Sequence, residues 1–203
     1  MAVVLLALGG CDSGSGSKSA QAGGASVIAP GKPGEAARTL SAEDAAKQRA
    51  DDDSPNTADF TYARMMIEHH TQALVMTELA PKQAESGNVK RIAARIAAAQ
   101  APEITTMKSW LKTHDGEPSA AHQEHEHEAM PGMATEAQLE KLRAAKGKAF
   151  DELFLKLMIT HHDGAITMAT DVKAEGNNVQ IEEMADDVIA QQTSEITRMR
   201  EMS

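Results

Sequence analysis

Residues 66–76 read MIEHHTQALVM, and residues 158–168 read MITHHDGAITM. Both stretches begin and end with methionine and carry a pair of adjacent histidines, and they are separated by a constant offset of 92 residues. A second pair of stretches keeps the same offset, with QAPEITTM at 100–107 and QTSEITRM at 192–199. Chance does not produce two such matches at one offset, so the sequence contains an internal repeat.

Each repeat predicts two helices joined by a tight turn. Ser86-Gly87-Asn88 in the first repeat and Glu175-Gly176-Asn177 in the second are signals that end one helix and begin the next. Two helical hairpins in one chain indicate an all-α fold, a four-helix bundle with approximate two-fold internal symmetry. The predicted helices cover residues 59–83, 88–112, 148–174 and 179–201, with a shorter helix at 135–145.

Composition supports helices and excludes one class of partner. Aromatic residues make up only 2% of the 203 residues, so the core must be built from Ala, Leu, Ile, Val and Met. The net charge is −10 and no basic stripe is present, which argues against binding to nucleic acid. No catalytic motif is recognisable, so we do not expect an enzyme.

The N-terminal region predicts export and anchoring. Residues 1–10 read MAVVLLALGG, an apolar run too short to span a bilayer, and Leu8-Gly9-Gly10-Cys11 resembles a bacterial lipobox. We therefore expect residues 1–11 to be a lipoprotein signal, with the protein held at the outer side of the bacterial cell membrane through a lipid on Cys11. Residues 12–54, rich in Gly, Ser, Ala and Pro, predict a flexible tether to a bundle at 55–203, made of repeats at about 57–112 and 148–203.

Helical periodicity directs polar side chains into the predicted core. At 100° per residue, the two histidines of each repeat lie on either side of an inward methionine. The other helix of each repeat directs a glutamine and a glutamate, Glu103 or Glu195, inward, with no Lys or Arg on the same face. A buried carboxylate needs a hydrogen-bond donor or a metal ion, and the histidines are the obvious candidates. Pro102, replaced by Ser194 in the second repeat, predicts a kink beside Glu103.

Imidazole and thioether side chains together suit copper. Thioether is a soft, neutral ligand that favours Cu(I), whereas imidazole accepts both copper states and zinc. Met66, His69 and Met76 lie on one ridge of a helix and can present sulfur and nitrogen to a single ion or to neighbouring ions. Glu103 and Glu195 are either acceptors that fix the histidine tautomers or occasional ligands.

The connection at 113–134 carries a second candidate site. Residues 122–133 read HQEHEHEAMPGM, a dense run of imidazole, carboxylate and thioether groups that is typical of a metal-capture loop. The alternative is a solvated acidic loop whose histidines are incidental. The weaker candidate ligands in this loop are His122, His125, His127, Met130 and Met133.

The chain resembles the domain of unknown function 305 family. The resemblance rests on residues 66–76 with 100–107, on 158–168 with 192–199, and on MPGMAT at 130–135. It implies a ferritin-like four-helix bundle, bacterial export and, for some members, copper binding through Met and His. By position, the resemblance implies these metal ligands: Met66, His69, His70, Met76, Met158, His161, His162 and Met168, with Met107 and Met199 behind them.

The sequence is compatible with three alternative functions. The first is a cell-envelope protein that binds copper, Cu(I) above all, and buffers it or exchanges it with a donor or acceptor protein; zinc and a homodimer stay open. The second is a structural or interaction bundle whose His–Glu–Gln network serves only the fold. The third, a di-iron oxidase, needs Glu-x-x-His motifs on the bundle helices, and the sequence has this motif only at Glu124–His127, in the loop.

Overall fold

The computed structural model describes residues 26–29, 36–42, 44, 53–114 and 130–202, which belong to two separate units, 1–50 and 51–203. In the first unit, β1 (Ser26–Ala29) pairs antiparallel with β2 (Arg38–Ser41), so that Ser26 lies opposite Ser41. The sequence analysis expected only a tether here, because two four-residue strands are too short to show a strand pattern. The signal at 1–11, with Cys11, lies outside the described residues.

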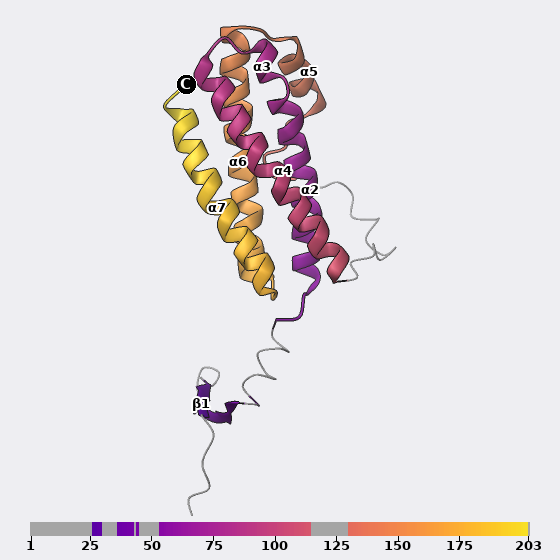
Figure 1. The fold of residues 1–203 in the computed structure, drawn as a ribbon, viewed down its shortest axis with the longest axis vertical. Helices are drawn as coiled ribbons and strands as arrows, with labels where there is room; N and C mark the ends of the chain where they lie inside the picture. The colour runs from indigo at the N-terminus through magenta and orange to yellow at the C-terminus, as the bar shows by residue number, and fades with distance from the viewer. Residues whose placement is uncertain (1–25, 30–35, 43, 45–52, 115–129, 203) are drawn as a thin grey trace, which may run out of the picture. The chain divides into compact units, whose positions relative to one another are not determined.

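The second unit confirms the all-α prediction. In the described part of this unit, the long helices are α2 (Thr57–Thr77), α4 (Gly87–Thr113), α6 (Lys148–Glu175) and α7 (Val179–Arg200), joined by two shorter ones, α3 (Ala80–Gln83) and α5 (Glu136–Ala144) (Figure 1). Helix α2 packs along α4, and α6 packs along α7. The two histidine-bearing helices, α2 and α6, also pack on each other, and so bring the repeats together.

The first helix of each repeat holds the turn of the other repeat. The Asp59 carboxylate accepts hydrogen bonds from the backbone N–H groups of Asn177 and Asn178, at 3.1 and 3.2 Å. At the equivalent position, Asp151 accepts from the N–H groups of Glu85 and Ser86, at 3.2 and 2.8 Å. These reciprocal contacts satisfy backbone donors at the two turns and fix how far each hairpin extends along the other.

One predicted helix is divided. The sequence predicts a continuous helix over 59–83, but α2 ends at Thr77 and α3 begins at Ala80. Pro81 is the physical reason, because it has no N–H to donate to the carbonyl four residues earlier and its ring clashes with that carbonyl. The other predicted helices agree closely with α4, α5, α6 and α7.

The interior is aliphatic and rich in methionine, as the composition predicted. The fully buried side chains include Phe150 stacked on Phe154, together with Ile96, Leu142 and Ile181. None of the helices in the described ranges is both long and apolar enough to cross a membrane.

Candidate metal centre

The four histidines of the repeats lie together in the middle of the bundle. His69 and His70 come from α2, His161 and His162 from α6, and all four are 0% exposed. The rings of His69 and His161 face each other across the contact between the two helices, with centroids 3.7 Å apart and planes tilted by 36°. The prediction that these side chains point into the core is confirmed.

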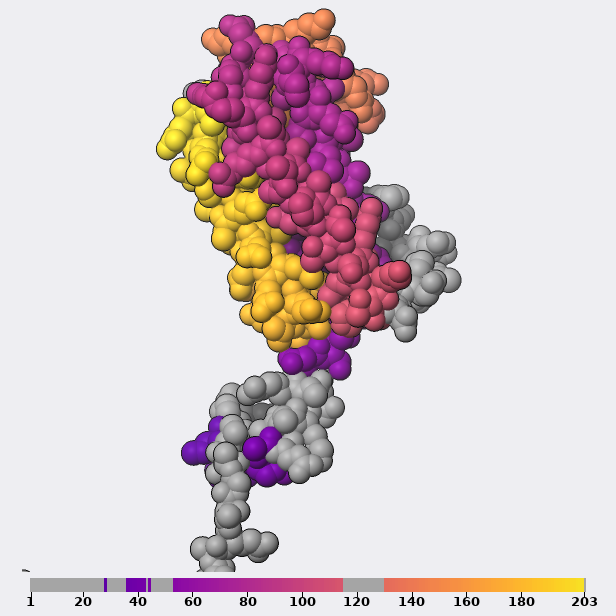
Figure 2. Space-filling view, viewed as in Figure 1, coloured from indigo at the N-terminus to yellow at the C-terminus, as the bar shows by residue number. Residues whose placement is uncertain are grey.

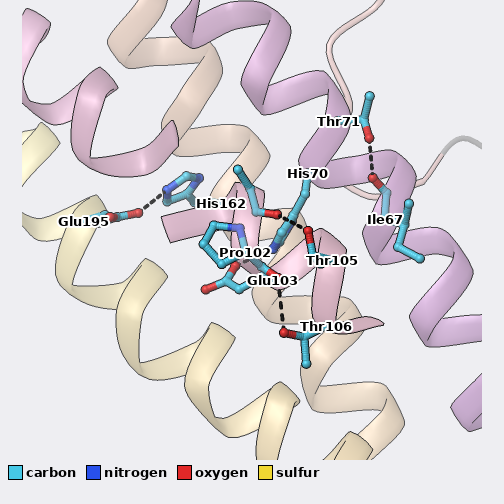
Figure 3. A network of polar contacts seen from close by, with 10 residues as sticks. Ile67, His70, Thr71, Pro102, Glu103, Thr105, Thr106, His162 and Glu195 are labelled. Carbon is cyan, nitrogen blue, oxygen red and sulfur yellow. Dashed lines mark hydrogen bonds and ion pairs between the residues drawn. The ribbon is translucent and has the colours of Figure 1, made fainter. Parts of the chain in front are cut away.

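The outer histidine of each pair contacts a glutamate from the neighbouring helix of its own repeat. The ring Nε2 of His70 lies 2.7 Å from Glu103 Oε2 on α4, and that of His162 lies 2.9 Å from Glu195 Oε2 on α7. Figure 3 shows both histidines with these carboxylates, and Pro102 directly beside Glu103. The histidines are therefore the partners that the inward carboxylates required.

The inner histidine of the first repeat contacts a backbone carbonyl instead. His69 Nε2 lies 3.0 Å from the carbonyl oxygen of Pro131, in a segment at 130–134 that we call the strap. Gln72 holds the strap on α2, because its side-chain amide donates to the Ala134 carbonyl at 3.0 Å and accepts from the Ala134 N–H at 2.7 Å.

Glycines let the strap lie against α6. A Cβ atom on Gly164 would lie 2.0 Å from the Pro131 oxygen, and one on Gly132, whose φ is +77°, would lie 2.4 Å from the Thr160 carbonyl. Neither position can take a larger residue without moving the strap. The repeat register pairs Gln72 with Gly164, so one repeat binds the strap and the other makes room for it.

These contacts decide where the ring protons lie. Carboxylates and carbonyls only accept, so Nε2 carries the proton in His69, His70 and His162, and in the neutral ring the lone pair is on Nδ1. None of these three Nδ1 atoms has a hydrogen-bond partner among the described residues, and neither ring nitrogen of His161 has one. Three buried imidazoles thus share one hydrogen-bond pattern, in which Nε2 is bonded and Nδ1 has no partner among the described residues.

Burial keeps the central pair neutral. It lowers the pKa of His69 from 6.5 to about 4, with the carbonyl of Pro131 acting in the opposite direction. Burial, together with the neighbouring imidazoles, holds the pKa of His161 well below its ordinary value. Both rings are therefore uncharged at neutral pH, the form in which imidazole binds a metal ion.

The bundle buries further polar groups that have no hydrogen-bond partner among the described residues. The side-chain amides of Gln100 on α4 and Gln192 on α7 are 0% exposed, and neither atom of either amide has a hydrogen-bond partner in the described structure. Burial also raises the pKa of Tyr62, whose hydroxyl has no hydrogen-bond partner there either, and the charge of Glu103 acts in the same direction. Each such group costs about 1–3 kcal/mol when nothing satisfies it.

The methionines separate into two packed clusters, each drawn from both repeats. Met66 and Met107 pack in the same cluster as Met168 of the second repeat. Met158 and Met199 pack in the other cluster with Met76 of the first repeat. Met66 and Met76 therefore belong to different clusters, which favours neighbouring ions over a single ion held along the ridge of α2.

The structure describes only some of the candidate metal ligands that the sequence places in the loop at 113–134. Met130 and Met133 are half-buried in the strap, whereas His122, His125 and His127 lie outside the described residues. Among the residues that the structure describes, no three His, Cys, Asp or Glu side chains gather to hold one ion.

Sequence reasoning missed two contacts of the centre. Arg95 Nε lies 3.6 Å from Glu195 Oε1, although its own side chain is 52% exposed. Periodicity placed Arg95 on an outer face and gave no sign that its long side chain reaches the core. The carbonyl of Pro131 was also missed, because a backbone acceptor leaves no side-chain signal; MPGM at 130–133 was the available clue.

Fold and site together define a four-helix protein with a buried histidine layer between two methionine clusters. The model of the family described as a domain of unknown function (DUF305) matches residues 59–203, so the chain belongs to the DUF305 family. A comparison with curated proteins gives no match.

Solved structures of the same family share the fold. A DUF305 protein from Streptomyces coelicolor, described as secreted, is 33% identical with a TM-score of 0.64, covering 71% of this chain and 89% of its own. A DUF305 fragment from Deinococcus radiodurans is 26% identical with a TM-score of 0.65, covering 73% and 96%. CopM in its Cu(I)-bound form is 30% identical with a TM-score of 0.59, covering 71% and 94%, and CopM is also known in Cu(II)-bound and Ag-bound forms.

Proposed function

We propose that this protein binds copper in its bundle core through histidine nitrogen and methionine sulfur, and that it buffers or transfers the ion at the cell envelope. The observation that carries the proposal is the hydrogen-bond pattern shared by His69, His70 and His162, in which Nε2 contacts an acceptor and Nδ1 has no partner among the described residues. Metal-binding histidines commonly donate one ring N–H to a carboxylate or carbonyl and offer the other nitrogen to the metal. Here that arrangement occurs three times within one buried layer.

The ligand chemistry of the core fits copper better than iron. Buried thioethers flank the imidazoles, and soft sulfur ligands select Cu(I). The ligands we propose are His69, His70, His161 and His162 with Met66, Met76, Met158 and Met168, while Met107 and Met199 lie behind them and Glu103 and Glu195 hold the tautomers. Because CopM, whose solved chain is covered to 94% by this match, is known in copper-bound and silver-bound forms, the same class of ion is the first to test.

The proposed location is outside the cytoplasm. The Streptomyces coelicolor relative is described as secreted, and the lipobox-like sequence before Cys11 adds an anchor on the outer side of the membrane. Thioether ligands suit that location because methionine keeps its donor capacity where free thiols are oxidised. A donor or acceptor protein, and a homodimer, are parts of the proposal that partner capture and mass measurement can test.

The direct test is titration of the protein with Cu(I) against a chromophoric chelator. We expect the wild type to take Cu(I) from the chelator, and the variant with His69, His70, His161 and His162 changed to Ala to lose most of this binding. A second variant with the loop residues His122, His125 and His127 changed to Ala separates core binding from loop binding. Unchanged stoichiometry in the core variant would rule out the core site.

The competing function is a polar network that only stabilises the bundle. It is supported by the His–Glu hydrogen bonds, which would exist without any ion. The two functions differ in their response to metal, because a ligand of the native state must raise the melting temperature. A melting temperature unaffected by saturating Cu(I) or Zn(II) would favour the structural function.

A further inference from the structure

The two His–Glu pairs differ in their access to solvent. Glu103 is 25% exposed on its side chain while its partner His70 is fully buried, whereas Glu195 and His162 are both fully buried. The first pair therefore has a carboxylate that reaches from the surface to a core imidazole. The second pair has no such link, although the repeat places the same residues there.

A groove lies on the surface at Glu103. It has a volume of about 480 Å³ and runs between α4 and α7, lined by Pro102, Glu103 and Met107 on one side and by Met184, Asp187 and Ala190 on the other. Figure 2 shows the face of the helical unit on which α4, in magenta, and α7, in yellow, lie next to each other. Two carboxylates and two thioethers thus line the groove, and one of these carboxylates, that of Glu103, contacts the ring of the buried His70.

The equivalent position in the other repeat differs in charge and in burial. The offset of 92 residues pairs Asp187 with Arg95, Met184 with Ile92, and Pro102 with Ser194. Arg95 lies over Glu195 and neutralises it, at 3.6 Å, where the first repeat has a second acid. Ser194 keeps the backbone N–H that Pro102 lacks, so α7 has no break in its hydrogen bonding at this position.

We propose that this groove is the entrance through which Cu(I) reaches the core, and that the second repeat has no entrance of its own. The inference rests on the proposed copper function and names the path to that same site. Asp187 and Glu103 attract the cation, and Met184 and Met107 offer soft sulfur along the way to His70. A negatively lined cleft raises the local concentration of a cation and its rate of entry by about 10- to 1,000-fold.

The test compares loading rates at equal final occupancy. Cu(I) is supplied as its bicinchoninate complex to the full chain without oxygen, and loss of the complex's absorbance is followed by stopped flow. Asp187→Arg copies the charge found in the second repeat, and Ala190→Trp fills the groove without changing charge. Asp171→Arg, an exposed position on α6 that does not line the groove, makes the same charge change elsewhere.

We expect Asp187→Arg and Ala190→Trp each to slow loading by about tenfold or more, with the same number of ions bound at the end, while Asp171→Arg loads like the wild type. Wild-type rates in both groove variants would overturn the entrance and leave the copper function standing. Loss of a bound ion in Asp187→Arg would also overturn it, because Asp187 would then be a ligand. If the wild type takes up no Cu(I), the proposed function fails and the entrance fails with it.

Discussion

The two repeats of this bundle are alike in their polar core residues and different in what surrounds them. Each places two histidines, a glutamate and a glutamine at matching positions in the core. In the first repeat Glu103 borders a groove, and the ring of His69 contacts the carbonyl of the strap. In the second repeat the glutamate is fully buried and contacts Arg95. The comparison teaches that the two repeats keep the same polar groups in the core and differ in the access of solvent to them.

The largest expected effect comes from removing the buried glutamate. Glu195→Ala leaves His162 Nε2 buried without an acceptor, and we expect a loss of about 3 kcal/mol in the free energy of unfolding. Glu103→Ala is the matched change in the first repeat, and we expect about 1 kcal/mol because water in the groove can replace the lost carboxylate. Urea unfolding of the metal-free proteins measures both. Equal losses would show that the two pairs are equally buried.

The next effect concerns the strap. Gly164→Ala puts a methyl group 2.0 Å from the Pro131 oxygen, so the strap must move and His69 loses its acceptor. We expect a destabilisation of about 2 kcal/mol. Gln72→Ala at the matching position removes only two hydrogen bonds and should cost about 1 kcal/mol. The same urea measurement applies, and a larger loss for Gln72→Ala would contradict the close approach of the strap to α6.

Acidification should weaken the metal-free fold through the central histidine pair. The pKa of His69 is lowered to about 4, and burial together with the neighbouring imidazoles holds that of His161 well below 6.5. Between pH 6.5 and 4 the unfolded chain therefore binds more protons than the folded chain, and stability falls as the pH falls. From pH 6 to 5 we expect a loss of about 1 kcal/mol for each of the two histidines.

The pH effect can be assigned by substitution. His69→Gln should flatten the decline in denaturant midpoint over this window, because it removes one of the two groups whose pKa burial lowers. A decline of wild-type steepness in His69→Gln would show that the titrating groups lie elsewhere.

The smallest expected change in stability concerns Pro102, which borders the groove, and its counterpart Ser194 in the second repeat. Pro102→Ala restores a backbone N–H within α4, and we expect a gain of up to about 1 kcal/mol, since the unfolded chain also becomes more flexible. Ser194→Ala at the matching position of α7 should change stability by only a few tenths, roughly 0.3 kcal/mol. Thermal melts of the two variants make the comparison. A stability loss in Pro102→Ala would mean that α4 is shaped around the proline.

Most of the fold could be predicted because it follows from a repeat. The offset of 92 residues placed both hairpins, and periodicity placed the histidines, Glu103 and Glu195 in the core. The break between α2 and α3 was foreseeable from Pro81. The contacts between the repeats could not be predicted, because the periodicity of one helix does not show which residues of another helix it contacts. The distribution of the methionines over two clusters and the contact of Arg95 with Glu195 depend on how the helices pack.

The central claim is that the buried imidazoles bind the ion through Nδ1. Nitrogen-15 NMR of histidine-labelled protein with and without one equivalent of Ag(I), a redox-stable substitute for Cu(I), tests it most directly. We predict that Nδ1 of core histidines shifts on binding while Nε2 of His70 and His162 stays protonated and bonded to Glu103 and Glu195. Bound Ag(I) with all core Nδ1 resonances unchanged would contradict the account.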